Sequence, residues 1–470
     1  MSAQTGTEAD RPTTVEERAA RGKRARAVLP LQALEACPEQ PLDAVAVLRA
    51  GDPDRVADLL PVRYGRMLAS AFTFYRGAAS VMAADLSTLD SSGLTAQLCG
   101  DAHLSNFGVY ASPERRLVFD LNDFDETLPG PFEWDVRRLA ASLTLAGRDN
   151  GVDRVDRVGA VATAMRAYRL AMRDFAGQGN LAVWYANLDV DKTMADLTPG
   201  ATASERRRTE KLVAKARGRT SQQAAGKLTV EVDGRRRFIE DPPLLVRLDT
   251  LLAEAGAEDV RDELLAILAE YRGTLVDDRR HLLDQFELVD VARKVVGVGS
   301  VGTRAFVLLM TGRDPDDTLV LQVKEAGASV LEPYWGSRSH ATAGERVVTG
   351  QRLMQATSDI FLGWQQTRGL DGKVRDFYVR QLRDGKGSVD VASLTLRQLT
   401  IYGELCAWTL ARAHARSGDR VAIAAYLGKK DTFEQALARF GESYADRVEQ
   451  QHAQLDHAAL TGGLEVTSGI

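Results

Sequence analysis

A polar loop between two short apolar runs most constrains what this chain can fold into. The runs, Leu94 to Cys99 and Leu117 to Leu121, have the length and composition of buried strands. The loop between them opens with a D-x-H-x-x-N motif from Asp101 to Asn106, and Asp123 lies just beyond the second run. Turn chemistry explains polar residues on a surface loop, but not their placement between two strands. We therefore expect these three side chains to share one site.

The three residues have the chemistry that phosphoryl transfer requires. Such a site uses one carboxylate to accept or orient the proton of the attacking hydroxyl, and an amide oxygen and a second carboxylate to hold magnesium. Asp101, Asn106 and Asp123 supply these groups in the expected order, so we predict that they are catalytic. We predict Asn106, Asp123 and Asp125 as magnesium ligands, with the alternative that Asp125 only orients Asp123.

A glycine-rich segment lies about two hundred residues downstream. Gly297, Gly299 and Gly302 form a G-x-G-x-x-G pattern, which alone also fits a dinucleotide-binding turn that opens a helix. Here residues 305–310 have the composition of a second strand, which indicates a hairpin. In a glycine-rich hairpin the backbone approaches nucleotide phosphates from above. We expect these glycines and Ser300 to cover the phosphates.

Lys324 ends the apolar strand that follows this hairpin. A solvated strand end is the commonest position for a lysine, but the preceding glycines favour a phosphate-binding lysine. In kinases such a lysine pairs with a glutamate on a helix. The amphipathic segment 343–355 predicts that helix, with Glu345 as the partner. Glu325 and Glu332 remain alternatives.

These motifs resemble the protein-kinase-like superfamily, especially its aminoglycoside phosphotransferase and choline kinase branch. The resemblance is carried by GDAHLSN at 100–106, NDF at 122–124 and the helix start at 134–140. Nearly the whole chain is also similar to a bacterial family catalogued as a domain of unknown function. The segments that carry this likeness include FTFYRGAA, DLNDFDE, VGVGSVGTR, LQVKEA, GQRLMQ, SDIFLGW, FYVRQL and LARAHARSGD.

The resemblance implies an α+β, two-lobed, kinase-like fold that is circularly permuted, because the acidic loop precedes the glycine loop. It would carry a helical insertion. The expected parts are a flexible N-terminus (1–28), a large helical lobe (29–200), a mostly helical insertion (201–285), a small β-rich lobe (286–385) and helices that complete the large lobe (386–470). Residues 376–382 would lead into a hinge, where the backbone near Val379 and Gln381 would read adenine.

Other polar residues have two interpretations each. Arg76 is either a phosphate or carboxylate contact or a buried arginine paired within the fold. The basic stretch 206–237 is either a solvated surface or an anion-binding lid. His103 could act as a base, but the resemblance implies that it orients the acidic loop, and this is the role that we favour. We expect Asp135 to hold the loop by hydrogen bonds, and His414 to be a cation at a helix end.

Composition favours a cytoplasmic enzyme. The net charge of −5 argues against general binding to nucleic acids. No apolar run approaches the ~20 residues that span a bilayer, and we expect no membrane partner. The three cysteines lack metal-ligand spacing and suit a reducing compartment.

The sequence thus predicts a phosphotransferase that uses ATP and Mg²⁺ and acts on an unidentified hydroxyl acceptor, with a small molecule favoured over a protein. Two alternatives remain: a nucleotidyltransferase that transfers AMP to a protein, and a pseudokinase scaffold that binds nucleotide without catalysis. Oligomeric state does not follow from the sequence.

Overall fold

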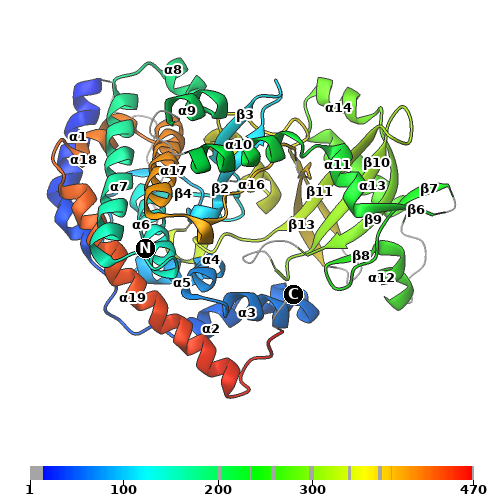
Figure 1. Cartoon of the computed structure of the whole chain (residues 1–470), viewed down its shortest axis with the longest axis horizontal. Coiled ribbons are helices and arrows are strands. Elements are labelled where there is room, and N and C mark those ends of the chain that lie inside the picture. Colours follow the sequence, from blue (N-terminus) through cyan, green and yellow to red (C-terminus); the bar gives the residue numbers. More distant parts are fainter. Residues whose placement is uncertain are drawn as a thin grey trace.

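The computed structural model describes residues 14–197, 203–232, 234–255, 261–295, 301–336, 340–368, 373–382 and 384–467. The fold is α+β, as expected. A helical body forms one side of the molecule, and an antiparallel six-stranded sheet with its own helices forms the other (Figure 1). The chain begins in the helical body, continues into the sheet, and returns to the helical body at its C-terminal end.

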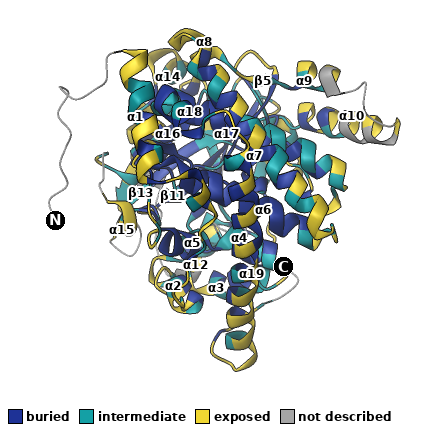
Figure 2. Cartoon of the chain, turned by 90° about the vertical axis from the view of Figure 1, so that its left-hand side faces the viewer, coloured by how far each residue is buried: buried dark blue, intermediate teal, exposed yellow. Residues whose placement is uncertain are grey.

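The helical body is built from two distant parts of the chain. The N-terminal half supplies α6 (Phe132–Asp149) and α7 (Arg154–Ala176), and the C-terminal part supplies α17 (Leu396–Ser417), α18 (Arg420–Leu427) and α19 (Thr432–Leu460). α17 and α19 both pack against α6 and α7. Figure 2 shows the most buried residues gathered on α6 and α17.

Local sequence explains where α17 begins and which face it buries. Thr395 and Gln398 form a reciprocal capping box that satisfies free backbone N–H groups at the start of the helix. Leu399, Cys406 and Leu410 recur at helical spacing and are fully buried. α17 is therefore one of the helices expected within 386–470, and it forms part of the core.

Shorter helices complete the N-terminal side of the body. They are α1 (Val15–Val28), α2 (Ala44–Arg49), α3 (Leu60–Met67), α4 (Ala71–Gly77) and α5 (Ala79–Leu86). The prediction of a flexible terminus up to residue 28 is wrong from Thr14 onward. A capping box between Thr14 and Glu17 starts α1, and Arg18 pairs with Asp419 at 2.8 Å where α1 packs on α18.

Two small sheets carry the acidic loop. β1 (Thr95–Leu98) pairs with β4 (Leu128–Pro131), and β3 (Leu117–Leu121) lies between β2 (Phe107–Ala111) and β5 (Leu188–Asp189). β1 and β3 are the two strands predicted around the loop, and β3 is buried along its whole length. The D-x-H-x-x-N motif therefore connects β1 to β2, and Asp123 follows β3.

The six-stranded sheet provides the other wall of the candidate site. Its order is β12 (Gly363–Arg368), β13 (Val374–Gln381), β11 (Thr318–Ala326), β10 (Ala305–Thr311), β9 (Glu287–Lys294) and β8 (Leu245–Arg247), all antiparallel. α16 (Ala343–Met354) packs on β11, β12 and β13. The predicted hairpin is present, since β9 and β10 are paired neighbours.

The region predicted as a separate helical insertion is partly integrated into this sheet. It contributes β8 as an edge strand, so the β-rich unit begins before residue 286. Its helices are α10 (Ala203–Arg217), α11 (Ser221–Leu228), α12 (Leu248–Ala255), α13 (Arg261–Gly273) and α14 (Asp277–Leu283). Two short helices, α8 (Asn180–Tyr185) and α9 (Val190–Leu197), precede it. In the same region β6 (Thr229–Val232) pairs antiparallel with β7 (Arg235–Phe238). Among the described helices, none combines the length and apolar character that a bilayer crossing requires.

Candidate functional site

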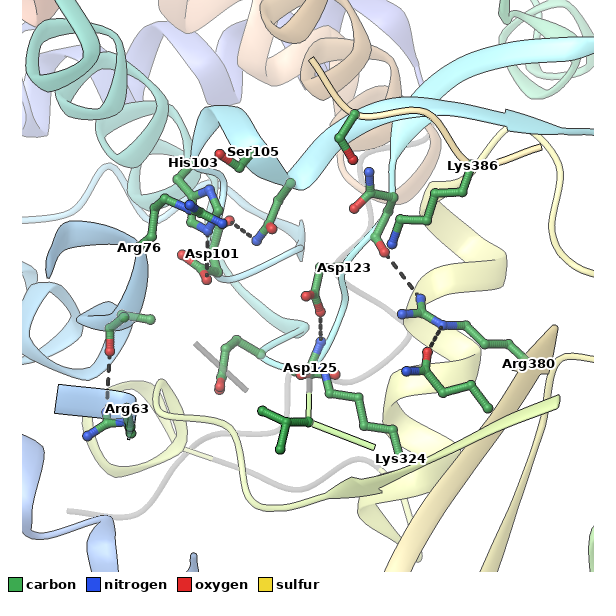
Figure 3. Close-up of a pocket in the computed structure, with 18 of the residues that line it drawn as sticks. Arg63, Arg76, Asp101, His103, Ser105, Asp123, Asp125, Lys324, Arg380 and Lys386 are labelled. Atoms are coloured by element: carbon green, nitrogen blue, oxygen red, sulfur yellow. Dashed lines mark hydrogen bonds and ion pairs between the residues drawn. The ribbon is translucent and has the colours of Figure 1, made fainter. Parts of the chain in front are cut away.

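A cavity of about 390 Å³ lies where the acidic loop faces the sheet (Figure 3). Its lining comes from α3 and α4, from the acidic loop, and from the ends of β9, β11 and β13. The predicted residues that line it are Asp101, Asn106, Asp123, Asp125, Lys324 and Gln381. Residues about two hundred positions apart in sequence thus share one polar cavity.

Asp135 holds the start of the acidic loop in place. Its carboxylate accepts hydrogen bonds from the backbone N–H groups of Cys99 at 2.8 Å and Gly100 at 3.0 Å. Gly100 has φ +80°, which a residue with a side chain rarely adopts. His414 lies in the last turn of α17, as expected, and is fully buried 3.3 Å from Asp135, so it also belongs to this network. The expected orienting role of Asp135 is supported by these contacts.

Asp101 lies against the Arg138 guanidinium. Two Arg138 nitrogens approach the same carboxylate oxygen at 2.5 Å. Burial raises the pKa of Asp101 to about 6, although Arg138 acts in the opposite direction. Such a carboxylate is ionised at neutral pH but remains a better proton acceptor than an exposed one. The pKa of buried His103, 3.5 Å from Asp101, is lowered well below its usual value by desolvation, so His103 is neutral.

Asn106 and Asp123 present oxygen atoms suited to magnesium. The Asn106 side-chain N–H donates to the Asp101 carbonyl at 2.9 Å, which leaves its amide oxygen for the cavity. Asp123 accepts a longer 3.3 Å bond from the backbone N–H of Asp125. Magnesium prefers hard oxygen ligands and is usually bound by one or two carboxylates with waters and substrate phosphates. Asn106 and Asp123 fit this requirement.

Asp125 contacts Lys324 and does not point a free carboxylate into the cavity. One Asp125 oxygen pairs with the Lys324 ammonium, and the other accepts from the Tyr378 hydroxyl at 2.8 Å. Burial opposes ionisation of Asp125, but Lys324 outweighs it and keeps the pKa below its usual value. Burial likewise opposes the charged form of Lys324, yet Asp123 and Asp125 raise its pKa. This geometry favours a role for Asp125 in positioning Lys324 over the predicted role as metal ligand.

Glu345, the predicted partner of Lys324, does not pair with it. Glu345 lies in the first turn of α16, where its carboxylate accepts from the Ala341 N–H at 3.0 Å. Within the described part of the chain, no ion pair joins Glu345 to Lys324. The alternatives Glu325 and Glu332 pair with arginines instead.

The glycine loop is only partly described. Gly297, Gly299 and Ser300 lie outside the described residues. Gly302 has φ +90°, and its carbonyl accepts the Val56 N–H at 2.7 Å. Arg55 donates to the neighbouring Val301 carbonyl at 2.6 Å, so the N-terminal segment ties down the end of this loop.

The two residues predicted to read adenine have other backbone environments. Val379 is paired with both β11 and β12 and is 1 % exposed, and it does not line the cavity. Gln381 does line the cavity, but its backbone N–H donates to Asp359 at 2.5 Å. Strand pairing at Val379 and the hydrogen bond to Asp359 at Gln381 therefore already use the backbone groups that we expected to contact adenine.

Sequence reasoning missed most of the cations that line the cavity. They are Arg55, Arg63, Lys294, Arg380 and Lys386; Arg76 was recognised with an open interpretation. Burial, followed by the nearby Arg380, lowers the pKa of Lys386 to about 7. Lys386 could have been recognised from the sequence, because a glycine stands on each side of it in the segment that follows β13. The basic side chains of 206–237 that the structure describes do not line this cavity, which favours the solvated surface over the lid.

Comparison with known proteins gives a family and no function. Residues 55–458 match a family described as an uncharacterized protein conserved in bacteria (DUF2252). The chain belongs to this family. Neither curated proteins nor solved structures gave a match. The DUF2252 region includes the acidic loop, Lys324 and the cavity, whereas α1 precedes it.

Proposed function

We propose that this protein is a phosphotransferase that uses ATP and Mg²⁺ and transfers the terminal phosphoryl group to a hydroxyl acceptor. One observation carries the proposal: Asp101, Asn106, Asp123 and Lys324 line a single cavity although they come from distant parts of the chain. The acidic loop and β11, which carries Lys324, each form for local reasons. A site that binds both a metal and a triphosphate requires that the two lie next to each other.

Each residue has a defined task in this proposal. The acceptor oxygen forms the bond to the terminal phosphorus, the bond from that phosphorus to the bridging oxygen of ADP breaks, and the hydroxyl proton goes to Asp101. Lys324 binds phosphate oxygens, and Asn106 and Asp123 hold magnesium. The metal neutralises charge on the phosphates when it is bound. Most of the rate enhancement then comes from positioning and charge neutralisation.

Three features of the architecture support a circularly permuted kinase-like fold. The sheet carries a glycine hairpin between β9 and β10 and a buried lysine on the next strand. α16 packs against the same sheet. The acidic loop, its orienting Asp135 and the long α17 belong to the helical body, as they would in the large lobe of such a fold.

The test compares ATP binding and turnover in matched variants. Asp123→Ala should abolish turnover, and Asp101→Ala should lower it severely while ATP affinity, measured by thermal shift with and without Mg²⁺, stays close to that of the wild type. Glu114→Ala, at an exposed turn between β2 and β3, is the control and should change neither. Equal consumption of ATP by the wild type and Asp101→Ala would refute the assignment.

The same experiment separates the two rival functions. Intact-mass analysis of the products distinguishes phosphoryl from adenylyl addition, and adenylyl addition would favour AMP transfer. Nucleotide binding with no turnover in any condition would favour a pseudokinase scaffold.

A further inference from the structure

Two separate groups of cations flank the acidic residues of the cavity. In Figure 3, Arg63 and Arg76 lie on the side of Asp101, and Lys324, Arg380 and Lys386 lie on the opposite side of Asp123. The first pair comes from α3 and α4 of the helical body, and the second group comes from the sheet and the segment after it. Cations therefore lie on both sides of the acidic residues, and we assign the group around Lys324 to the triphosphate.

The arginine pair lacks internal partners for several of its donors. Arg63 is 3 % exposed, and neither its Nε nor its Nη1 makes a hydrogen bond. Its nearest carboxylate oxygen, on Asp52, is 3.7 Å away, and its Nη2 reaches the Gly77 carbonyl only at 3.4 Å. The Nε of Arg76 is also buried without a partner. The protein itself therefore leaves these guanidinium groups incompletely satisfied.

Keeping such cations buried is costly, and Asp52 near Arg63 and Asp101 near Arg76 offset only a part of that cost. Desolvation lowers the pKa of Arg63 to about 10 and also lowers that of Arg76. Stacking of Arg63 over the Tyr64 ring, at 5.2 Å, offsets a part of this cost. A purely structural role would be expected to satisfy the donors, because unpaired buried polar groups are rare in native proteins. A bound oxyanion would satisfy them, since guanidinium groups favour carboxylate and phosphate.

The charge of the whole cavity also favours an anionic ligand. Seven lysine and arginine side chains line it, against four aspartate and glutamate side chains. A polycationic acceptor such as an aminoglycoside, or a quaternary amine such as choline, would meet repulsion there. In this respect the cavity differs from what the resemblance to that branch suggests.

We propose that Arg63 and Arg76 form an oxyanion subsite next to Asp101, and that the acceptor is a small hydroxylated molecule that carries a phosphate or a carboxylate. The inference rests on the proposed function and names the substrate class of the same site. The anionic group docks on the arginine pair, which would direct the acceptor hydroxyl toward Asp101.

Inorganic phosphate is the first probe of this subsite. Calorimetry on the full chain, saturated with Mg²⁺ and the non-hydrolysable analogue AMP-PNP, should detect phosphate binding. Arg76→Gln and Arg63→Gln should each weaken that binding by about tenfold or more and leave AMP-PNP affinity nearly unchanged. Arg76 is the more accessible of the two, so its variant tests the subsite even if Arg63→Gln fails to fold.

Small alcohols then distinguish the possible sources of the anion. Glycerol 3-phosphate, glycerate, glycerol and choline are titrated into the same complex. Binding of either anion, lost in Arg76→Gln, supports the inference and identifies phosphate or carboxylate as the group recognised. Binding of choline or glycerol without either anion would overturn it.

The controls separate this inference from the proposed function. Failure of AMP-PNP to bind the wild type would overturn the proposed function. Normal AMP-PNP binding, with phosphate binding that is absent or indifferent to Arg76→Gln, would overturn the subsite alone. Phosphate binding that AMP-PNP abolishes would show that phosphate occupies only the nucleotide site, and would also overturn it.

Discussion

Arg412 and Asp120 form an ion pair that joins the two halves of the chain. Arg412 lies on α17 and Asp120 on β3, 292 residues apart, and each side chain is 1 % exposed. Their atoms approach to 2.5 Å, and Asp120 also accepts the Ala356 N–H at 2.8 Å. We predict that Arg412→Met strongly destabilises the protein, because it leaves a buried carboxylate without its counter-charge.

The burial of the pair sets the size of the effect. Removing one partner of a buried ion pair costs about 3–5 kcal/mol, because the remaining charge is uncompensated. Arg439→Met is the matched control, since Arg439 pairs with Glu35 at the same 2.5 Å but both side chains are about half exposed. Exposed pairs contribute only about 0–1 kcal/mol. The two variants should therefore differ by at least about 2 kcal/mol.

Urea denaturation followed by tryptophan fluorescence measures both free energies of unfolding. The double variant Arg412→Met with Asp120→Asn should recover part of the loss, because it no longer buries an unpaired charge. If Arg412→Met costs no more than Arg439→Met, the ion pair does not hold the two halves together and the reasoning is refuted.

Three further predictions concern the cavity. Turnover should rise with pH through about 6 as Asp101 loses its proton, because the raised pKa keeps the carboxyl protonated below that value; a profile flat between pH 5 and 7 would contradict this. ATP affinity should fall as pH rises through about 7, where Lys386 loses its charge, and Lys386→Gln should remove that dependence in a titration series. Gly100→Ala should abolish turnover, because the added Cβ would collide with the Glu126 carbonyl oxygen. Gly93 also has a positive φ but faces open space, so Gly93→Ala is the control. It should lower the stability measured by thermal unfolding by only about 1–2 kcal/mol and preserve turnover.

Local patterns were sufficient to predict the acidic loop and much of the sheet. The strands around the loop, the hairpin before Lys324 and the helix over 343–355 depend on short-range signals such as apolar runs, glycines and helical periodicity. The orienting role of Asp135 was also predicted, although its partners Cys99 and Gly100 lie 36 and 35 residues earlier in the chain.

Long-range pairings could not be predicted in the same way. Lys324 pairs with Asp125 rather than Glu345, and this choice depends on how the sheet sits against the loop. Arg63 of α3 looks like an ordinary surface residue until the fold buries it. Similarly, β8 has three residues, too few to show a period of its own.

The division of the helical body between the two ends of the chain has a consequence for synthesis. When α6 and α7 leave the ribosome, α17 and α19, which cover them, are still more than two hundred residues from being translated. The nascent chain must hold apolar helix faces exposed for that interval, a state prone to aggregation. Production of this protein should therefore depend on chaperones that shield the early helices until the last ones arrive.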